Sequence, residues 1–165
     1  MNKSEIIDKV LRAYTAYYDV KTEEPTPPFF AEANFHSHDE QYFLVKSARI
    51  GETESNEKLF FAEAGELTDA EVREFDEKAW EEGLKDVKPH GEHKNSDVAL
   101  VIICDSATKE ARNQVKKLNH YKSYKMGLWG FSRNSIVLIE CESGRLTFNR
   151  QGALLKKLFK NILIQ

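Results

Sequence analysis

Histidines and acids gather at two places in the chain, and both groups could supply metal ligands. His36 and His38 are separated by one residue, while Glu92 and His93 follow His90. Neutral imidazole and carboxylate commonly bind zinc, and a His-x-His pair on a strand projects both rings to one face. We therefore predict a divalent metal at His36, His38, Glu92 and His93. The spacing matches no zinc finger or His-Glu-x-x-His helix, so the alternative is that these are polar turn residues beside strands.

Basic residues form a second candidate site in the last third of the chain. Two tyrosines, Tyr121 and Tyr124, stand among them. Basic side chains next to aromatic rings can hold phosphates and stack on bases, which predicts an anion-binding face for a nucleic acid or another polyanion. The alternative is that these charges only neutralise acids of the same fold or of another copy. The basic residues concerned are Lys109, Arg112, Lys116, Lys117, Lys122 and Lys125.

Known catalytic patterns do not assemble in the sequence. A restriction-endonuclease-like site needs an Asp and a Glu-x-Lys on adjoining strands, where the carboxylates hold Mg²⁺. Glu92-His93-Lys94 has this spacing but falls in a predicted loop, and on the strand that carries Lys46 the acid position holds Leu44. The glycine patterns of nucleophile elbows, dinucleotide sites and phosphate-binding loops are absent. The sequence therefore favours a protein that is not an enzyme.

The elements that must position these residues follow the order α-βββ-α-β-α-βββ-α. Apolar residues at helical spacing predict a first helix from Asn2 that ends before Pro25. Thr68 and Glu71 have the spacing of a capping box, which predicts a helix from Thr68 to about Val87. Ser106 or Thr108 can cap a third helix, and a last one begins near Gly152. The predicted strands are Phe29–His36, Gln41–Ile50, Lys58–Ala64, Val98–Cys104, Tyr121–Phe131, Ser135–Cys141 and Leu146–Asn149.

One strand, Val98–Cys104, is apolar at every position, as in strands that are buried on both faces. A buried strand followed by a helix implies a parallel pair, whereas the short connections elsewhere imply hairpins. We expect a mixed α/β fold with a single mixed sheet of about six strands and helices packed on it. The length of 165 residues suits one domain over the whole chain, 1–165.

Composition narrows the class of protein further. Charged residues make up 31% and hydrophobic residues 41%, which is typical of a globular chain. The longest uncharged apolar run, Val98–Cys104, is far shorter than the ~20 residues that span a bilayer, so we expect no membrane association. The two cysteines, Cys104 and Cys141, stand in apolar runs and read as inert core residues. We expect a cytoplasmic protein.

Charge is divided along the chain. Residues 1–105 contain 12 Lys and Arg against 24 Asp and Glu, a net charge of −12. Residues 106–165 contain 12 Lys and Arg against 3 Asp and Glu, a net charge of +9, so the total of −3 is a cancellation. Opposite charge on two parts of one chain predicts self-association, because the two parts of different copies attract each other.

One long segment resembles a family of short, uncharacterised bacterial and archaeal proteins. The similarity lies in Pro89-His90-Gly91-Glu92-His93, in the buried strand at Val98, and in Lys125-Met126-Gly127-Leu128-Trp129-Gly130 before the strand at Ile136–Ile139. The aromatic-rich region 29–63 is also similar. The resemblance implies one coherent fold over most of the chain and implies no activity.

Three functions remain open from the sequence. The one we favour is a binding or regulatory module that forms a homo-oligomer and needs no cofactor. The second is a metal-dependent, phosphate-directed hydrolase that uses the histidine group beside the basic helix. The third is binding of single-stranded nucleic acid by the basic face.

Overall fold

The apolar segment Val98–Cys104 lies at the centre of one mixed sheet, within the strand β4 (His93–Ala107) of the computed structural model. The structure describes residues 1–36 and 54–165. In these residues the sheet has seven strands, in the order β1-β2-β3-β4-β6-β5, and β7 pairs with β6. The other strands are β1 (Asp19–Lys21), β2 (Ala31–His36), β3 (Glu54–Leu67), β5 (Tyr121–Ser123), β6 (Phe131–Glu140) and β7 (Arg145–Phe148).

Parallel and antiparallel pairs divide the sheet as the connections require. Strands β1, β2 and β3 form an antiparallel meander, whereas β3, β4 and β6 run parallel. Helices α2 (Asp69–Leu84) and α3 (Lys109–Lys117) make the two crossovers between these parallel strands. The predicted mixed α/β fold, with one mixed sheet and helices packed on it, is confirmed.

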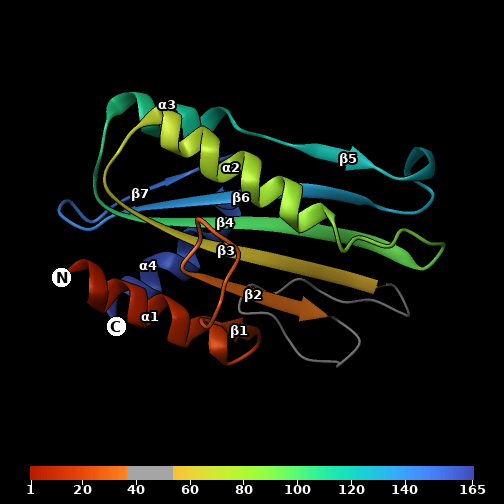
Figure 1. Cartoon of the computed structure of the whole chain (residues 1–165), viewed down its shortest axis with the longest axis horizontal. Helices are drawn as coiled ribbons and strands as arrows, with labels where there is room; N and C mark the ends of the chain where they lie inside the picture. The colour runs from red at the N-terminus through yellow and green to blue at the C-terminus, as the bar shows by residue number, and fades with distance from the viewer. Residues whose placement is uncertain (37–53) are drawn as a thin grey trace.

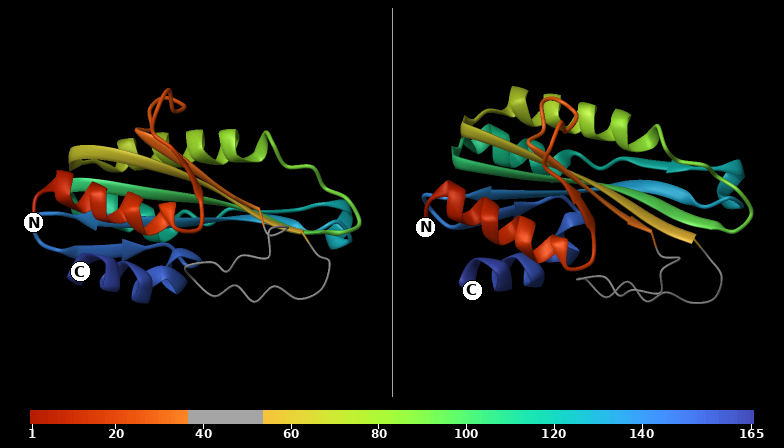
Figure 2. Two further views of the ribbon diagram at one scale, coloured as in Figure 1. Left: turned by 90° about the horizontal axis from the view of Figure 1, so that it is seen from below. Right: turned by 60° about the horizontal axis from the view of Figure 1, so that its bottom comes forward.

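The four α-helices cover both faces of the sheet. Helices α1 (Lys3–Thr15) and α4 (Lys156–Ile164) lie on one face, and α2 and α3 lie on the other (Figures 1 and 2). Side chains alternate between these faces along each strand. Phe61 and Val101 therefore pack under α1 and α4, whereas Phe60 and Leu100 pack under α2 and α3.

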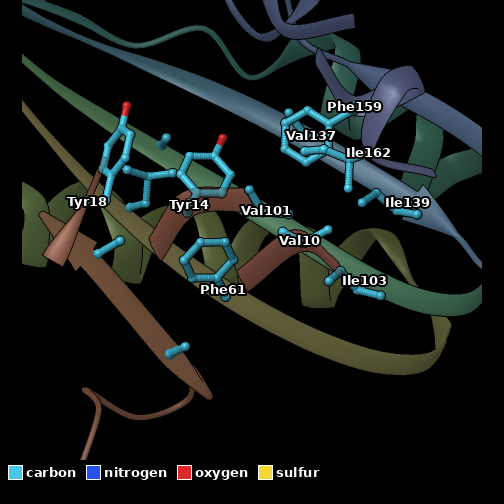
Figure 3. Close-up of a cluster of buried hydrophobic side chains, with 14 of the residues drawn as sticks. Val10, Tyr14, Tyr18, Phe61, Val101, Ile103, Val137, Ile139, Phe159 and Ile162 are labelled. Carbon is cyan, nitrogen blue, oxygen red and sulfur yellow. The ribbon is translucent and has the colours of Figure 1, made fainter. Parts of the chain in front are cut away.

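The core under α1 is built around aromatic rings (Figure 3). Tyr14 is 2% exposed and contacts Tyr18 and Phe61 edge to face, with ring centroids 5.0 and 5.7 Å apart. Phe159 of α4 lies 6.3 Å from the Tyr14 ring, which joins the two helices over the sheet. Edge-to-face pairs of this kind add about 1 kcal/mol each beyond the area that they bury.

Helix starts are set by local side chains, as the sequence predicts. Asn2 caps α1 and Thr68 caps α2, each in a full capping box, and Thr108 rather than Ser106 caps α3. These side chains satisfy backbone N–H groups that have no partner inside the helix. None of the helices in the described residues is long and apolar enough to cross a membrane.

Several boundaries differ from the predictions. The predicted strand Tyr121–Phe131 is wrong: β5 ends at Ser123, a short 3₁₀ turn covers Lys125–Gly127, and β6 begins at Phe131. Positive φ angles at Met126 and Gly130 break the extended backbone there. Strand β1 is absent from the predicted order. The predicted strand Gln41–Ile50 lies outside the described residues.

Candidate functional site

A polar pocket opens on the α2 face of the sheet, at the amino-terminal ends of β3 and β4. Its volume is about 480 Å³. The segment after α2 forms one wall, and strands β2, β3 and β4 form the floor. We call it the α2 pocket, and it is lined by Asn34, Asn56, Glu57, Lys58, Gly83, Asp86, Val87, Lys88, Ser96 and Asp97.

Strand register brings the polar side chains of this pocket together. Asn34 on β2 is paired with Lys58 on β3, and Asn56 on β3 is beside Ser96 on β4. Residues paired across neighbouring strands project to the same face, so these four side chains converge on the α2 side. Gly83 allows the end of α2 to approach closely, because a Cβ there would meet Val98 Cγ1 at 2.8 Å.

On the α2 face of the sheet, the charged side chains of the pocket leave a surplus of positive charge, because the other two acids of the lining, Glu57 and Asp97, lie on the opposite face. Lys58 Nζ lies 3.1 Å from Asp86 Oδ2 and 5.6 Å from the centroid of the Phe60 ring. Lys88 adds a second cation, so the side chains that point to this face carry two positive charges and one negative charge. Together with the Asn34 and Asn56 amides, the pocket is rich in hydrogen-bond donors.

Ser96 in the pocket floor is hydrogen-bonded to a buried histidine, His93, which does not itself line the pocket. His93 Nε2 lies 2.7 Å from Ser96 Oγ, and His93 Nδ1 lies 2.7 Å from the main-chain oxygen of Trp129. A carbonyl oxygen only accepts hydrogen bonds, so in the neutral ring Nδ1 carries the proton. Nε2 is then the acceptor, and the Ser96 hydroxyl donates to it. The residues are 4% and 7% exposed, respectively.

A strand irregularity places His93 and Ser96 on the same face. Residues three apart on a regular strand point to opposite faces. Here Glu54 pairs with His93 and the next residue of β3, Ser55, pairs with Asn95, so the strand contains an extra residue, Lys94. Such a bulge shifts the alternation by one position, which turns the His93 ring toward Ser96.

Gly130 makes the contact between His93 and Trp129 sterically accessible. Its φ is +81°, and a Cβ at this position would collide with the Lys94 main-chain oxygen and lie 2.7 Å from His93 Nδ1. The edge of the Tyr124 ring packs on the His93 ring, with centroids 5.7 Å apart. The imidazole is therefore held in one orientation by groups on three sides.

Two acids lie under the pocket on the opposite face of the sheet. Glu57 and Asp97 are neighbours in the β3–β4 register, and Tyr18 donates a hydrogen bond of 3.2 Å to Glu57 Oε1. Burial, reinforced by the charge of Asp97, raises the pKa of Glu57 to about 8. Burial also raises the pKa of Asp97 to about 6, against the opposing effect of Arg133, whose Nε lies 3.5 Å from Asp97 Oδ1.

A further histidine, His120, belongs to a hydrogen-bonded network that joins several elements of the fold. His120 Nε2 lies 2.6 Å from Asp76 Oδ2, and its ring stacks on Trp80 with centroids 5.1 Å apart. Asn134 donates to the other Asp76 oxygen, Oδ1, at 3.2 Å. Burial raises the pKa of Asp76, and His120 opposes this shift. This network ties α2 to β6 and to the segment after α3.

The four predicted metal ligands are only partly placed by the structure. His36 ends β2, but its side chain and all of His38 lie outside the described residues. Glu92 is exposed, and both ring nitrogens of His93 are within hydrogen-bond distance of protein groups. In the described part of the chain, no three His, Cys, Asp or Glu side chains are grouped so as to hold a metal ion. The metal site stays a prediction.

The six predicted anion-binding residues are spread over the molecule. Lys109, Arg112, Lys116 and Lys117 belong to α3, whereas Lys122 is on β5 and Lys125 is in the turn at the opposite end of that layer (Figure 1). Arg112 Nη1 pairs with Glu140 Oε1 at 3.0 Å, and Lys125 Nζ lies 4.3 Å from the Trp129 ring centroid. The binding of a polyanion by this set stays a prediction.

At the strand positions where a restriction-endonuclease-like site has metal-binding acids, this protein has asparagines. Within the described residues, β2 and β3 present Asn34 beside Asn56-x-Lys58 on one face. An Asp and a Glu would be required in place of the two asparagines to hold Mg²⁺. The lysine is present without the acids, and this arrangement suits hydrogen bonding to a ligand.

Ser96, Asn34, Asn56 and Lys58 are not among the sequence-predicted site residues. Asn56 and Lys58 are two residues apart, so a predicted strand that began at Asn56 rather than at Lys58 would have placed both side chains on the same face. The pairing of Ser96 with His93 has no such signal, because it depends on the bulge at Lys94.

Comparison with known proteins identifies the family. A model for the family described as Domain of unknown function (DUF8052) matches residues 2–161. No curated protein and no solved structure matches the chain significantly. The chain therefore belongs to the DUF8052 family.

Proposed function

We propose that this DUF8052 protein is a binding module whose α2 pocket holds a small ligand with an oxyanion group, either a carboxylate or a phosphate. The observation that carries the proposal is the convergence of donors from separate strands. Asn34, Asn56 and Lys58 line the same cavity, and its volume of about 480 Å³ falls within the range that is typical of small-molecule sites.

Electrostatics support an anionic ligand. Lys58 and Lys88 outnumber Asp86 in the pocket. The acids below the floor oppose this surplus only weakly, because burial raises the pKa of Glu57 to about 8, which favours its protonated form at neutral pH, and Asp97 lies beside Arg133. A charged ammonium group that donates to an oxyanion makes a stronger bond than a neutral donor does.

Binding is tested with inorganic phosphate and with acetate, at constant ionic strength kept with chloride. In ¹H–¹⁵N spectra, the amide signals of Asn56, Lys58 and Ser96 are expected to move and to saturate at millimolar concentrations. Lys58→Gln should weaken binding about tenfold, because it removes a charged donor. Asp86→Asn should strengthen binding, since it releases Lys58 from its ion pair.

The control is Lys78→Gln, which removes a lysine of α2 that pairs with Glu82 outside the pocket. It should leave binding unchanged. Shifts that do not saturate, or that are equal in the wild type and Lys58→Gln, would refute the proposal.

A second candidate is self-association, which the sheet order favours. The acidic part of the chain forms β1 to β4, and the basic part forms β5 to β7. In the strand order, the acidic part therefore makes up one half of the sheet and the basic part the other half. The acidic half of one copy can face the basic half of another.

We further propose that the protein works in the cytoplasm, where the free cysteines Cys104 and Cys141 suit a reducing compartment.

A further inference from the structure

We propose that Ser96 is a nucleophile activated by His93, and that the α2 pocket accepts an acyl group from a small carboxylic ester. The inference rests on the proposed function, because the acyl carboxyl carbon would occupy the place of the bound oxyanion. It adds a covalent step that simple binding does not include.

The arrangement around Ser96 has the parts that activation of a hydroxyl requires. The base must contact the nucleophile, and a third group must hold the base in the correct tautomer. His93 Nε2 is 2.7 Å from Ser96 Oγ, and the Trp129 carbonyl fixes the proton on Nδ1 at 2.7 Å. Asn56 Nδ2 donates to Ser96 Oγ at 3.4 Å, so the serine proton is directed to His93.

Another serine of the same sheet shows the contrast. Ser132 on β6 is fully buried, and its hydroxyl shares a hydrogen bond of 2.8 Å with the Tyr124 hydroxyl. A phenol is a poor base at neutral pH, and Ser132 lines none of the described pockets. Ser96 has an imidazole partner and a surface on the α2 pocket.

Donors for a developing oxyanion stand beside the nucleophile. Asn56 is next to Ser96 in the strand register, and Lys58 follows two residues later on the same face of β3. Preorganised donors stabilise the tetrahedral intermediate of acyl transfer, and the loss of one typically costs a factor of about 100 in rate. Lys58 is thus positioned to polarise the ester carbonyl, whereas Asn56, which donates to Ser96 Oγ, orients the nucleophile.

The step balances with groups that are present. Ser96 Oγ forms a bond to the ester carbonyl carbon, and its proton passes to His93 Nε2. The bond between the carbonyl carbon and the leaving oxygen breaks, and the imidazolium returns the proton to that oxygen as an alcohol is released. Water then attacks the acyl-serine with His93 as base, which releases the carboxylic acid and restores Ser96.

The experiment uses p-nitrophenyl acetate and a fluorophosphonate, which loses fluoride when the serine oxygen bonds to phosphorus. Intact mass spectrometry of the full chain should show one phosphonyl group per molecule, and peptide mapping should place it on Ser96. Ser96→Ala should take up none, and His93→Gln should slow labelling by at least about 100-fold. Release of p-nitrophenol should fall in parallel.

Ser143→Ala, at an exposed serine in the turn before β7, is the control and should label at the wild-type rate. A urea-denatured chain should not label, because the activation depends on the folded geometry. If Ser96→Ala fails to fold, the peptide that carries the label in the wild type decides the same question, and a label on another residue would contradict the proposal. In addition, Ser96→Cys should change the rate of p-nitrophenol release, since it replaces the attacking atom.

The two proposals fail separately. Absence of label from Ser96 with phosphate binding intact would overturn the nucleophile and leave the binding module. Equal labelling of wild type and His93→Gln would overturn the role of His93. Absence of both binding and label would overturn both proposals, whereas label without phosphate binding would support the nucleophile and overturn the ligand class.

Discussion

At the scale of single residues, the amino-terminal ends of β3 and β4 hold groups whose ionisation the fold changes. Glu57 lies between Tyr18 and Asp97, with Arg133 beyond Asp97. Burial and the neighbouring acid both disfavour its charged form, and the pKa rises from 4.5 to about 8. Folding therefore stabilises the protonated carboxyl.

Glu57 should make stability depend on pH. A raised folded-state pKa contributes stability that is complete below the unfolded pKa of about 4.5 and is lost as the pH rises through about 8. Glu57→Gln cannot ionise and keeps an acceptor for Tyr18, so it should avoid that loss. We expect this variant to exceed the wild type by several kcal/mol near pH 9 and by less than about 1 kcal/mol near pH 5.

Urea denaturation at both pH values measures this difference. Glu63→Gln, an exposed change on the same strand, is the control and should follow the wild type. Parallel stability profiles for the wild type and Glu57→Gln would contradict the expectation.

Gly130 is a second residue whose role can be measured. Ala at this position adds a Cβ that collides with the Lys94 carbonyl and imposes a positive φ on a non-glycine residue. The expected loss of unfolding free energy is about 3 kcal/mol. Gly127 also has a positive φ but faces open space, so Gly127→Ala should cost only about 1 kcal/mol. Equal losses in thermal or urea unfolding would show that steric contact at Gly130 is unimportant.

At the scale of elements, helix α2 sets the pocket wall. Its start is fixed by Thr68, which accepts a hydrogen bond from the Glu71 N–H while the Glu71 carboxylate accepts one from the Thr68 N–H. Its end is fixed by contact of Gly83 with Val98, which positions Asp86 and Lys88 over the strands. The ligand-facing segment therefore depends on a helix that is anchored at both ends.

Removal of the α2 cap should be visible in stability. Thr68→Ala is expected to lower the unfolding free energy by about 1 kcal/mol, because the Glu71 N–H at the helix start loses its acceptor. Thr68→Ser keeps the hydroxyl and should stay near the wild type. Chemical denaturation followed by circular dichroism gives both values, and a loss of the same size in Thr68→Ser would argue against the capping role.

At the scale of the whole molecule, the sheet separates charge. The boundary between the acidic and basic parts, near residue 105, falls at the end of β4 in the middle of the sheet. Attraction between the acidic half of one copy and the basic half of another gives a head-to-tail contact. Salt weakens such contacts when they are exposed to solvent.

Light scattering coupled to size exclusion tests self-association. The mass should exceed the 19.0 kDa of one chain at low salt and return to it at high salt. Reversal of two exposed lysines of α3, Lys116→Glu with Lys117→Glu, should abolish the low-salt assembly. The control reverses Lys9 and Lys21, which lie in the acidic part of the chain, and should keep the assembly. A strict monomer at both salt concentrations would end this hypothesis.

Local patterns in the sequence determined most of the elements. Apolar periodicity and capping residues predicted α1 and α2, and the uninterrupted apolar run at Val98–Cys104 predicted the central strand. These predictions succeed because the information is carried by residues close together in the chain. The strand predicted over Tyr121–Phe131 failed because left-handed backbone angles at a few residues outweighed its aromatic content.

The candidate site was decided by the tertiary structure. Asn34, Lys58 and Ser96 come from three separated segments, and only strand register makes them neighbours. The contact of Ser96 with His93 needs one extra residue at Lys94 and a glycine at 130, because a shift of one position reverses the face of every following side chain. The sequence by itself determined which elements form and how charge is divided among them, and the packing of those elements decided which residues share a pocket.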